Sequence, residues 1–332
     1  MPYCRLAHCR ARQQSAQGRT GSRPTSFGEN PVTSSVRAGY AALLGRPNVG
    51  KSTLLNRLLG QKLSITAPKP QTTRHVILGI QTLPEAQIVY VDTPGLHRQG
   101  RRAMNRYLNR AAASVIGYVD VAIFLIEALR WTDEDQDVLD RLAGFPGPVV
   151  LAINKVDRIA DKSRLLPFLQ EIAGKRNFTE VTPLSALKGD NVAELERIIA
   201  RLLPTQAFLF PEDQLTTASE RFLVAELIRE KLTRLLREEL PYALTVEIEQ
   251  FIEEERLVRL HAVIWVERAS QKGIVIGEKG ATLREVGRQA RQDMEQLLGR
   301  KVFLETWVKV REGWSDDERA LRSLGYADPG AP

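Results

Sequence analysis

The sequence contains very little cysteine. Only two of its 332 residues are cysteines, Cys4 and Cys9, and both lie close to the first residue. A chain with no further cysteine cannot build a disulfide framework, which fits a reducing compartment. His8 lies between the two thiols, but a structural zinc site needs a fourth ligand and an ordered scaffold. We therefore expect no zinc site in this segment.

Long apolar runs are also missing. Hydrophobic residues make up 43% of the chain, yet no run approaches the ~18 apolar residues that a membrane-spanning helix needs. The composition predicts a globular cytoplasmic protein. At 332 residues the chain exceeds what one hydrophobic core usually supports, so we expect two domains.

The charge is unevenly distributed. The net charge of +7 suggests an acidic partner such as nucleic acid. Residues 1–36 hold five arginines, one glutamate and no lysine, so this segment carries +4 and leaves +3 for the rest. It lacks periodic apolar residues and is predicted to be a disordered basic extension. Its composition fits either an organellar transit peptide or translation from an upstream start codon.

Short apolar runs alternate with polar loops and helical patterns between residues 37 and 205. Runs of consecutive apolar residues predict buried parallel strands. They cover residues 40–44, 88–91, 121–126 and 149–153, and a helix is predicted over 191–203. This rhythm is typical of a doubly wound α/β domain.

A different pattern follows this first domain. Residues 206–235 are predicted to form a linker and a leading helix, with the helical pattern running from 219 to 237. The next region, 236–327, is predicted to be an α+β domain, and 328–332 a tail. Its predicted elements are strands at 243–252, 257–266 and 302–310, and a Gly-rich turn followed by a helix at 281–298. The element order is α-β-β-α-α-β.

Charge within this second domain is polarised. Residues 236–267 carry three basic and eight acidic residues, which gives −5, whereas residues 268–311 carry ten basic and five acidic residues, which gives +5. We expect one basic face. The four tryptophans of the chain are assigned to the core.

The segment GRPNVGKS at residues 45–52 fits the phosphate-binding pattern G-x-x-x-x-G-K-[ST]. It lies between a predicted strand and a predicted helix, which is the context that the pattern requires. Lys51 is expected to bridge the terminal phosphates, and the Ser52 hydroxyl to bind Mg²⁺. The predicted GTP contacts in this segment are Gly45, Asn48, Val49, Gly50, Lys51, Ser52 and Thr53.

The segment NKVD at residues 154–157 follows a predicted strand and selects the base. Asp157 is expected to accept two hydrogen bonds from guanine, whereas adenine would leave that buried carboxylate unpaired. Such a site can reject an analogue by on the order of 10⁴. The predicted contacts to the base are Asn154, Lys155, Asp157, Ser185 and Ala186.

Two further segments complete a predicted Ras-like P-loop GTPase domain. Asp92 ends a predicted strand and is expected to hold Mg²⁺ through water, and Gly95 would offer its amide to the γ-phosphate. Thr73, in the loop between the phosphate-binding segment and Asp92, is expected to complete the Mg²⁺ shell, although Thr72 is an alternative. The predicted Mg²⁺ residues are therefore Ser52, Thr73 and Asp92. Four such segments in this order indicate a nucleotide switch.

These residues resemble the Era family of bacterial GTPases. The resemblance covers nearly all of residues 37–327, and its further runs are 71–75, 92–97, 239–242, 273–280 and 307–326. It implies a GTPase domain joined to a type II KH domain. It also implies binding to the 3′ end of 16S rRNA, and a role in 16S rRNA processing and 30S ribosomal subunit assembly. The family further implies a monomer and peripheral contact with the inner face of the cell membrane.

A KH domain binds RNA through a G-x-x-G loop, and GEKG at residues 277–280 matches that loop. Lys279 would face phosphate, whereas the Glu278 carboxylate would repel it. The three apolar residues before the loop would line a groove for bases. The predicted RNA contacts are Ile274, Val275, Ile276, Gly277, Glu278, Lys279, Gly280 and Arg284.

Hydrolysis is expected to be slow. Leu96 follows Gly95 where many Ras-like proteins have a glutamine that orients water. We hypothesise that Lys51, Thr73 and Gly95 act with Mg²⁺, and with a K⁺ held partly by Asn48, as in relatives that share this asparagine. Rates should stay below ~1 s⁻¹.

Nucleotide is expected to alter RNA binding through the linker at residues 204–218. Two other interpretations stay open: an RNA-binding assembly scaffold with a vestigial GTPase, and a signalling GTPase with a protein-binding second domain.

Overall fold

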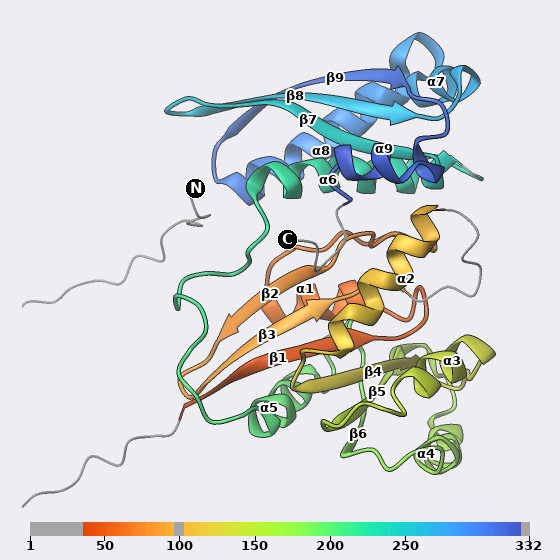
Figure 1. Cartoon of the computed structure of the whole chain (residues 1–332), viewed down its shortest axis with the longest axis vertical. Helices are drawn as coiled ribbons and strands as arrows, with labels where there is room; N and C mark the ends of the chain where they lie inside the picture. The colour runs from red at the N-terminus through yellow and green to blue at the C-terminus, as the bar shows by residue number, and fades with distance from the viewer. Residues whose placement is uncertain (1–35, 96–102, 239, 327–332) are drawn as a thin grey trace, which may run out of the picture.

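The computed structural model describes residues 36–95, 103–238 and 240–326 (Figure 1). Leu96, the predicted tail at 328–332 and all but the last residue of the predicted basic extension lie outside the described residues. The described chain contains a six-stranded sheet and a three-stranded sheet, each with its own helices.

The six-stranded sheet carries the first half of the chain. Its strands are β1 (Arg37–Leu44), β2 (Ile77–Thr82), β3 (Ala86–Asp92), β4 (Val121–Glu127), β5 (Val149–Asn154) and β6 (Glu180–Pro183). Their order is β2-β3-β1-β4-β5-β6, and all pairs are parallel except β2 with β3. The four predicted apolar runs are confirmed as strands. The antiparallel strand β2 was not predicted.

Helices cover both faces of this sheet, as the doubly wound prediction requires (Figure 1). One core cluster joins the sheet to α1 (Lys51–Leu59) and α5 (Val192–Leu202). The opposite cluster joins it to α2 (Ala103–Ile116), α3 (Asp133–Arg141) and α4 (Leu165–Ala173). The carboxyl ends of the parallel strands share one edge, so the loops that follow them gather there.

The three-stranded sheet belongs to the second half of the chain. Its elements are α6 (Glu220–Leu235), β7 (Leu244–Glu253), β8 (Leu257–Val266), α7 (Ala269–Ile276), α8 (Ala281–Leu298), β9 (Lys301–Val310) and α9 (Glu318–Ser323). The strand order is β7-β8-β9, with β7 antiparallel and β9 parallel to β8. Helices α6 and α8 lie between this sheet and the first domain (Figure 1). The predicted α-β-β-α-α-β order is confirmed.

Two expectations for this half are wrong. Val275 was expected to line a groove for bases, but helix α7 directs its side chain fully into the core. Among the tryptophans, Trp314 is fully buried, but Trp307 is 43% exposed. An apolar side chain on a strand is buried only if its face of the sheet is covered, and strand identity alone does not reveal which face that is.

The linker runs along β2. The Ile80 amide donates to the Leu215 carbonyl at 2.8 Å, and the Thr216 hydroxyl donates to the Leu78 carbonyl at 2.6 Å. These bonds satisfy polar groups at what would otherwise be an open sheet edge.

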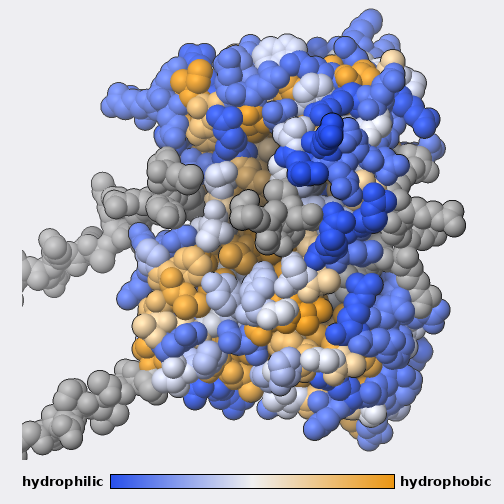
Figure 2. All heavy atoms as spheres, in the orientation of Figure 1, coloured by the Kyte–Doolittle hydropathy of each residue, from blue (hydrophilic) through white to orange (hydrophobic). Residues whose placement is uncertain are grey.

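The two halves share a seam of apolar and aromatic side chains. Ala103, Met104, Tyr107 and Leu108 of α2 pack in one buried cluster with residues near the end of the chain. Those partners are Trp314, Ala320, Leu321 and Tyr326. Elsewhere the surface visible in Figure 2 is mostly hydrophilic, with hydrophobic residues in separate groups. Among the described residues, no helix has both the length and the apolar character to cross a membrane.

Candidate functional site

The loop between β1 and α1 has the backbone of a phosphate cradle. Asn48 and Gly50 adopt positive φ values of 62° and 108°. A Cβ added at Gly50 would lie 2.3 Å from Nδ2 of Asn154, so this position needs glycine. Helix α1 begins at Lys51, so the N-terminus of this helix lies at the end of the same loop.

Lys51 is buried within this loop. Its ammonium donates to the Gly45 carbonyl at 2.8 Å and to the Arg46 carbonyl at 3.1 Å. Desolvation lowers the pKa of Lys51 to about 8, although the nearby Asp92 carboxylate acts in the opposite direction. A phosphate would offer this cation a stronger partner than two neutral carbonyl oxygens.

Three oxygen-bearing side chains meet beside Lys51. Ser52 Oγ donates to Oδ2 of Asp92 at 2.8 Å and lies 2.8 Å from Thr73 Oγ1. The other carboxylate oxygen, Asp92 Oδ1, is buried and has no hydrogen-bond partner. Burial raises the pKa of Asp92, while Lys51 opposes that rise. Clustered hydroxyl and carboxylate oxygens with one unsatisfied atom fit Mg²⁺, a cation that prefers oxygen ligands.

The two adjacent threonines point to different partners. The Thr72 hydroxyl donates to the Lys69 carbonyl at 2.6 Å and so belongs to its own loop, whereas Thr73 reaches Ser52. Gly95 comes from the next loop along the chain. A Cβ added there would lie 2.9 Å from Cγ of Pro47, so Gly95 lies directly against the phosphate-binding loop.

Asn154 connects three segments of the site. Its Nδ2 donates to the Val49 carbonyl at 2.7 Å, and its Oδ1 accepts from the backbone amides of Ala186 at 2.9 Å and Lys155 at 2.8 Å. The side chain is 2% exposed, so these bonds are shielded from water. Asn154 therefore fixes the 154–157 turn relative to the phosphate-binding loop.

Asp157 lies near Ser185, as expected, but its environment differs from the prediction. The Ser185 hydroxyl donates to Asp157 Oδ1 at 2.6 Å. Asp157 is exposed in this structure, so the expectation of a buried carboxylate is wrong here. One carboxylate oxygen is held by serine, which leaves the other to face a ligand.

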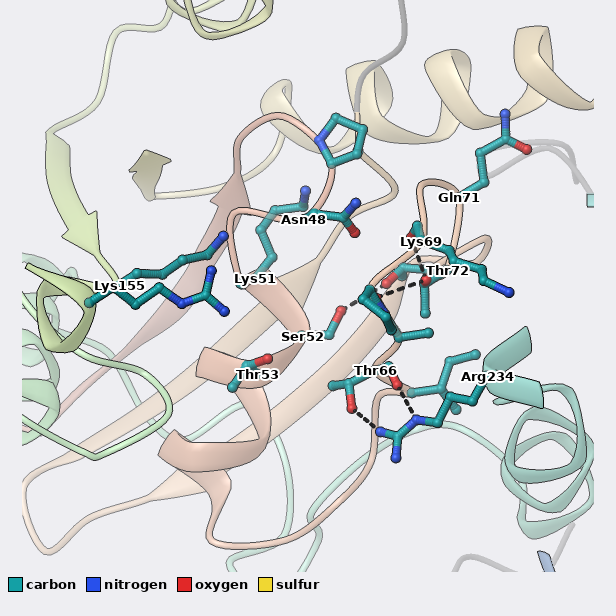
Figure 3. Close-up of a pocket in the computed structure, with 18 residues that line it drawn as sticks. Asn48, Lys51, Ser52, Thr53, Thr66, Lys69, Gln71, Thr72, Lys155 and Arg234 are labelled. Carbon is teal, nitrogen blue, oxygen red and sulfur yellow. Dashed lines mark hydrogen bonds between the residues drawn. The ribbon is translucent and has the colours of Figure 1, made fainter. Parts of the chain in front are cut away.

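A cavity of about 450 Å³ brings many of these residues together (Figure 3). The predicted residues that line it are Asn48, Gly50, Lys51, Ser52, Thr53, Thr73, Gly95 and Lys155. Those that do not line it are Gly45, Val49, Asp92, Asn154, Asp157, Ser185 and Ala186. Of this second group, Gly45, Val49, Asp92 and Asn154 hydrogen-bond directly to residues of the site.

Sequence reasoning missed a charged network behind the loop. Arg46 donates to Glu127 at 2.8 Å and to Asp135 at 3.1 Å, and Lys155 lies 3.2 Å from the same Glu127 oxygen. Burial alone would raise the pKa of Glu127, but the hydrogen bonds from Arg46 and Lys155 bring it below its ordinary value. Glu127 thus joins the phosphate-binding loop to the base-reading turn. No local pattern marks it, because its partners lie on other segments.

Sequence reasoning also missed two arginines from the second half of the chain that contact the nucleotide cavity and its loop. Arg234 of α6 lines the cavity and donates to the Thr66 hydroxyl at 2.8 Å (Figure 3). Arg229 of α6 donates to the Thr72 carbonyl. The loop that carries Thr73 is therefore held by a helix about 150 residues further along the chain.

The G-x-x-G segment forms a sharp, exposed connection between α7 and α8. Gly277 and Gly280 have positive φ values of 74° and 79°, and Lys279 one of 49°. A Cβ at Gly277 would lie 2.2 Å from the Thr282 hydroxyl, so glycine is required. Glu278 and Lys279 are both exposed, and Arg284 donates to the Lys279 carbonyl at 3.0 Å. Ile274 is 56% exposed and Ile276 half-buried.

Comparison with known proteins agrees with this architecture. The family described as 50S ribosome-binding GTPase matches residues 40–155, and the KH domain family matches residues 239–315. The chain is thus a GTPase with a Ras-like nucleotide domain and a KH domain.

Similarity to whole proteins narrows that class. The chain is 56% identical over 294 residues to the GTPase Era of Azotobacter vinelandii, covering 89% of this chain and 98% of that protein. With the GTPase Era of Pseudomonas aeruginosa PAO1 the identity is 55%, over 90% and 97% of the two chains. The chain belongs to the Era GTPase family.

Two solved Era structures share its fold. A variant of Aquifex aeolicus Era bound to GDP and AlF4⁻ has a TM-score of 0.85 and 40% identity, covering 88% of this chain and 100% of that one. An Era complex with MgGDPNP and nucleotides 1506–1542 of 16S ribosomal RNA also has a TM-score of 0.85 and 40% identity, over 88% and 99% of the chains.

Proposed function

We propose that this GTPase is a slow molecular switch that binds 16S rRNA near its 3′ end and assists 16S rRNA processing and 30S subunit assembly. One observation carries the proposal: the consecutive residues Thr73 and Arg74 contact different domains. Thr73 lies at the nucleotide cavity beside Ser52, whereas Arg74 is buried against the KH domain. A change at the γ-phosphate would therefore reach the RNA-binding domain through one peptide bond.

Binding of nucleotide rests on the residues around Lys51. Lys51 holds the terminal phosphates, the amides of the phosphate-binding loop orient them, and Asp157 with Lys155 selects guanine. Ser52 and Thr73 would hold Mg²⁺ directly and Asp92 through water, and the ion would neutralise charge on the phosphate oxygens. The buried, unpartnered Asp92 Oδ1 supports this assignment.

Hydrolysis in this proposal depends on positioning. The Gly95 amide, held against Pro47, would orient the γ-phosphate, and Lys51 would stabilise the charge that develops on it. Asn48 lines the cavity, and its side-chain amide oxygen is the kind of ligand that would hold K⁺. No glutamine is invoked, so turnover is expected to be slow.

RNA binding rests on the exposed loop at residues 277–280. The related Era protein bound to 16S rRNA nucleotides 1506–1542 makes that RNA the natural candidate. Lys279 and Arg284 would contact phosphate, and Ile274 and Ile276 would contact bases. Val275 is omitted from this set because it lies in the core.

The coupling between the two sites is proposed to run through the 62–74 loop rather than the linker. Arg74 donates to the carbonyls of Leu244 and Pro241, both at 2.8 Å. Lys62 contacts Glu230 of α6 at 2.5 Å and Asp293 of α8 at 2.7 Å. The linker instead hydrogen-bonds to β2 through Leu215 and Thr216.

The same proposal places the protein in the cytoplasm as a monomer, with its target in the 30S subunit. Peripheral contact with the inner face of the cell membrane is included as an expectation of the family, and flotation with liposomes is its direct test.

The decisive experiment measures affinity for an RNA with the sequence of 16S nucleotides 1506–1542, in GDP and in a non-hydrolysable GTP analogue. We expect a difference of about 5- to 150-fold, the usual range of allosteric coupling. The matched variants are Arg74→Met, which should reduce the difference, and Arg201→Met, at an exposed arginine of α5, which should not. Equal affinity in both nucleotides would remove the switch and favour a scaffold. No RNA binding in either would remove the RNA target and favour a signalling GTPase.

A further inference from the structure

One wall of the nucleotide cavity is built by segments from both halves of the chain. Residues 65–69, in the loop between α1 and β2, all line the cavity. Arg234 of α6 lines it beside them (Figure 3). Of the described residues that line this cavity, Arg234 alone comes from the second half of the chain. A site made mostly by the first domain therefore takes one charged side chain from the helix that leads into the second.

Thr66 is held by α6 through all of its polar groups. Its backbone amide donates to Glu230 Oε1 at 2.9 Å, and its carbonyl accepts from Arg234 Nε at 2.9 Å. Its hydroxyl accepts from Arg234 Nη2 at 2.8 Å and lies 3.3 Å from Glu230 Oε1 (Figure 3). A carboxylate and a guanidinium of one helix thus bind a single residue of the cavity wall. This set of contacts is called here the Thr66 clamp.

The clamp is anchored in a buried network of charges. The Glu230 side chain is fully buried, and its other oxygen lies 2.5 Å from the Lys62 ammonium and 3.3 Å from that of Lys231. Asp293 of α8 contacts both lysines, at 2.7 Å and 2.5 Å. Burial alone would raise the pKa of Glu230, but the hydrogen bonds from Lys62 and from the Thr66 amide bring it below its ordinary value. A buried charge that loses a partner is costly, so the network resists rearrangement.

Arg234 keeps hydrogen-bonding capacity for a ligand. Its Nε and Nη2 bond to Thr66 and Glu230, whereas Nη1 forms no hydrogen bond with any part of the chain that the structure describes. The side chain is 45% exposed. The described residues that line the cavity include no carboxylate and five cations, which are Lys51, Lys69, Lys155, Arg158 and Arg234. Such a cavity favours an anionic ligand, and a nucleotide brings several negative charges.

We propose that Arg234 is a positioning residue for the guanine nucleotide, and that α6 sets the affinity for GDP and GTP through the Thr66 clamp. Fixing residues 65–69 before the nucleotide arrives removes the entropy cost of ordering this wall on binding. The second half of the chain would thereby contribute to nucleotide affinity without contacting the phosphate-binding loop. This role depends on the GTPase class of the chain, and on neither the proposed rRNA target nor the proposed switch.

The alternative is that Arg234 only stabilises the contact between the two halves. The position of the clamp favours a role at the nucleotide. Arg74, which also joins the halves, donates to the Leu244 carbonyl and does not line the cavity. Arg234 and Thr66 both line it. An arginine that served only the interface would have no need for an exposed and incompletely paired guanidinium at this cavity.

The clamp is separate from the Mg²⁺ cluster. Ser52 bonds to Thr73 and Asp92, and within the described residues none of these three shares a hydrogen bond with Thr66 or Arg234. We therefore expect the clamp to act on GDP and on a GTP analogue to the same extent. The proposed switch, in contrast, distinguishes the two nucleotides, so the two ideas can fail independently.

The test measures Kd for Mg-GDP and for a non-hydrolysable Mg-GTP analogue by calorimetry on the full-length protein, together with kcat and KM for GTP. Arg234→Met removes the guanidinium and keeps an unbranched side chain. Its control is Arg237→Met, at an exposed arginine whose charge also acts on Lys69 but which takes no part in the clamp. Arg234→Lys keeps the charge with one nitrogen in place of three, and Thr66→Val removes only the hydroxyl. Circular dichroism and thermal unfolding without nucleotide check the fold of each protein.

We expect Arg234→Met to raise both Kd values about tenfold, the equivalent of one hydrogen bond at the upper end of its usual net contribution. KM for GTP should rise by the same factor with little change in kcat, because KM follows Kd when hydrolysis is slow. Arg237→Met should bind as the unaltered protein does, and Arg234→Lys should recover only part of the lost affinity. Thr66→Val should weaken binding about two- to fivefold alone and hardly further in the Arg234→Met background, since groups in contact are not additive.

Equal effects of Arg234→Met and Arg237→Met on Kd would overturn the proposal, because charge alone would then explain the loss. Full recovery by Arg234→Lys would do the same. A loss confined to the GTP analogue would assign Arg234 to the γ-phosphate instead, and a lower thermal stability with unchanged Kd would leave it an interface residue only. Should Arg234→Met fail to fold, Thr66→Val decides, and unchanged Kd in that variant overturns the proposal.

Discussion

The low pKa of Lys51 predicts that nucleotide binding takes up a proton in mildly alkaline solution. Burial lowers this pKa from 10.5 to about 8 in the protein. Phosphate groups next to the ammonium would favour its charged form and raise the pKa again. The test compares the unaltered protein with Lys51→Met, which keeps an unbranched side chain but cannot titrate.

The direction and size of this proton uptake follow from the pKa of Lys51 in the free protein and in the nucleotide-bound protein. At pH 7 about 90% of free Lys51 is protonated, as it is in the bound protein, so binding should change its protonation very little. At pH 9 about 90% of free Lys51 is neutral, so binding should take up close to one proton. Above pH 8, affinity should then fall by up to about tenfold per pH unit.

The lowered pKa of Lys51 also makes the stability of the fold depend on pH, and stability should rise with pH where nucleotide affinity falls. In the unfolded chain Lys51 keeps the ordinary pKa of 10.5. The folded form loses its proton first as pH rises from 8, so this group's destabilising effect of about 3 kcal/mol is present below pH 8 and diminishes between pH 8 and 10.5. Urea unfolding of the nucleotide-free protein at pH 7.5 and 9.5 measures this change.

Calorimetry gives the clearest measurement of the proton. Mg-GDP is titrated into each protein at pH 7 and pH 9, in two buffers of different ionisation enthalpy. Any ionisation of the nucleotide itself appears equally with Lys51→Met, so the difference between the proteins isolates Lys51. Equal proton uptake by both proteins at pH 9 would refute a depressed Lys51 pKa. Weak binding by the variant can be followed by competition with a fluorescent GDP.

Three further predictions concern single groups. Thr73→Ala should lower the affinity for Mg²⁺ in the complex with a GTP analogue by about tenfold or more. Thr72→Ala should have little effect, because the Thr72 hydroxyl bonds within its own loop. Equal effects of the two substitutions would contradict the assignment of Thr73. Replacing K⁺ with Na⁺ should slow hydrolysis, and equal rates would remove K⁺ from the proposal. Arg74→Met should lower the free energy of unfolding by about 2–4 kcal/mol, because it leaves buried carbonyls unpaired; urea denaturation of this variant beside Arg201→Met tests the claim.

Much of the nucleotide domain could be predicted because its signals are local. The phosphate-binding segment needs glycine where φ is positive, as at Gly50, and it must lie between a strand and a helix. Apolar runs such as residues 121–126 and 149–153 are buried on both faces, so their hydrophobicity is continuous. Strand β2 was missed because buried and half-buried residues are mixed along it, and because it contacts the linker rather than a second strand on that side.

The remaining errors concern contacts between distant segments. Val275 was expected in an RNA groove because it lies two residues before the G-x-x-G loop. The helix α7 that it belongs to directs its side chain into the core instead. Glu127 and Arg234 carry no motif, since their partners are far away in the chain. Arg74 illustrates the limit most clearly: nothing in its neighbourhood indicates that three carbonyls from residues 241–244 surround its guanidinium.

The buried seam between α2 and the end of the chain limits how this protein can be divided. Cutting within the linker would free a nucleotide domain whose α2 exposes Met104, Tyr107 and Leu108 to water, and a KH domain that exposes Trp314. Each fragment would expose apolar surface that promotes association, and would lose packing contacts that bury part of its core. The KH domain is therefore part of the structural support of the nucleotide domain, much as a bound subunit would be. GTP hydrolysis rates measured on an isolated nucleotide domain would not apply to the intact protein.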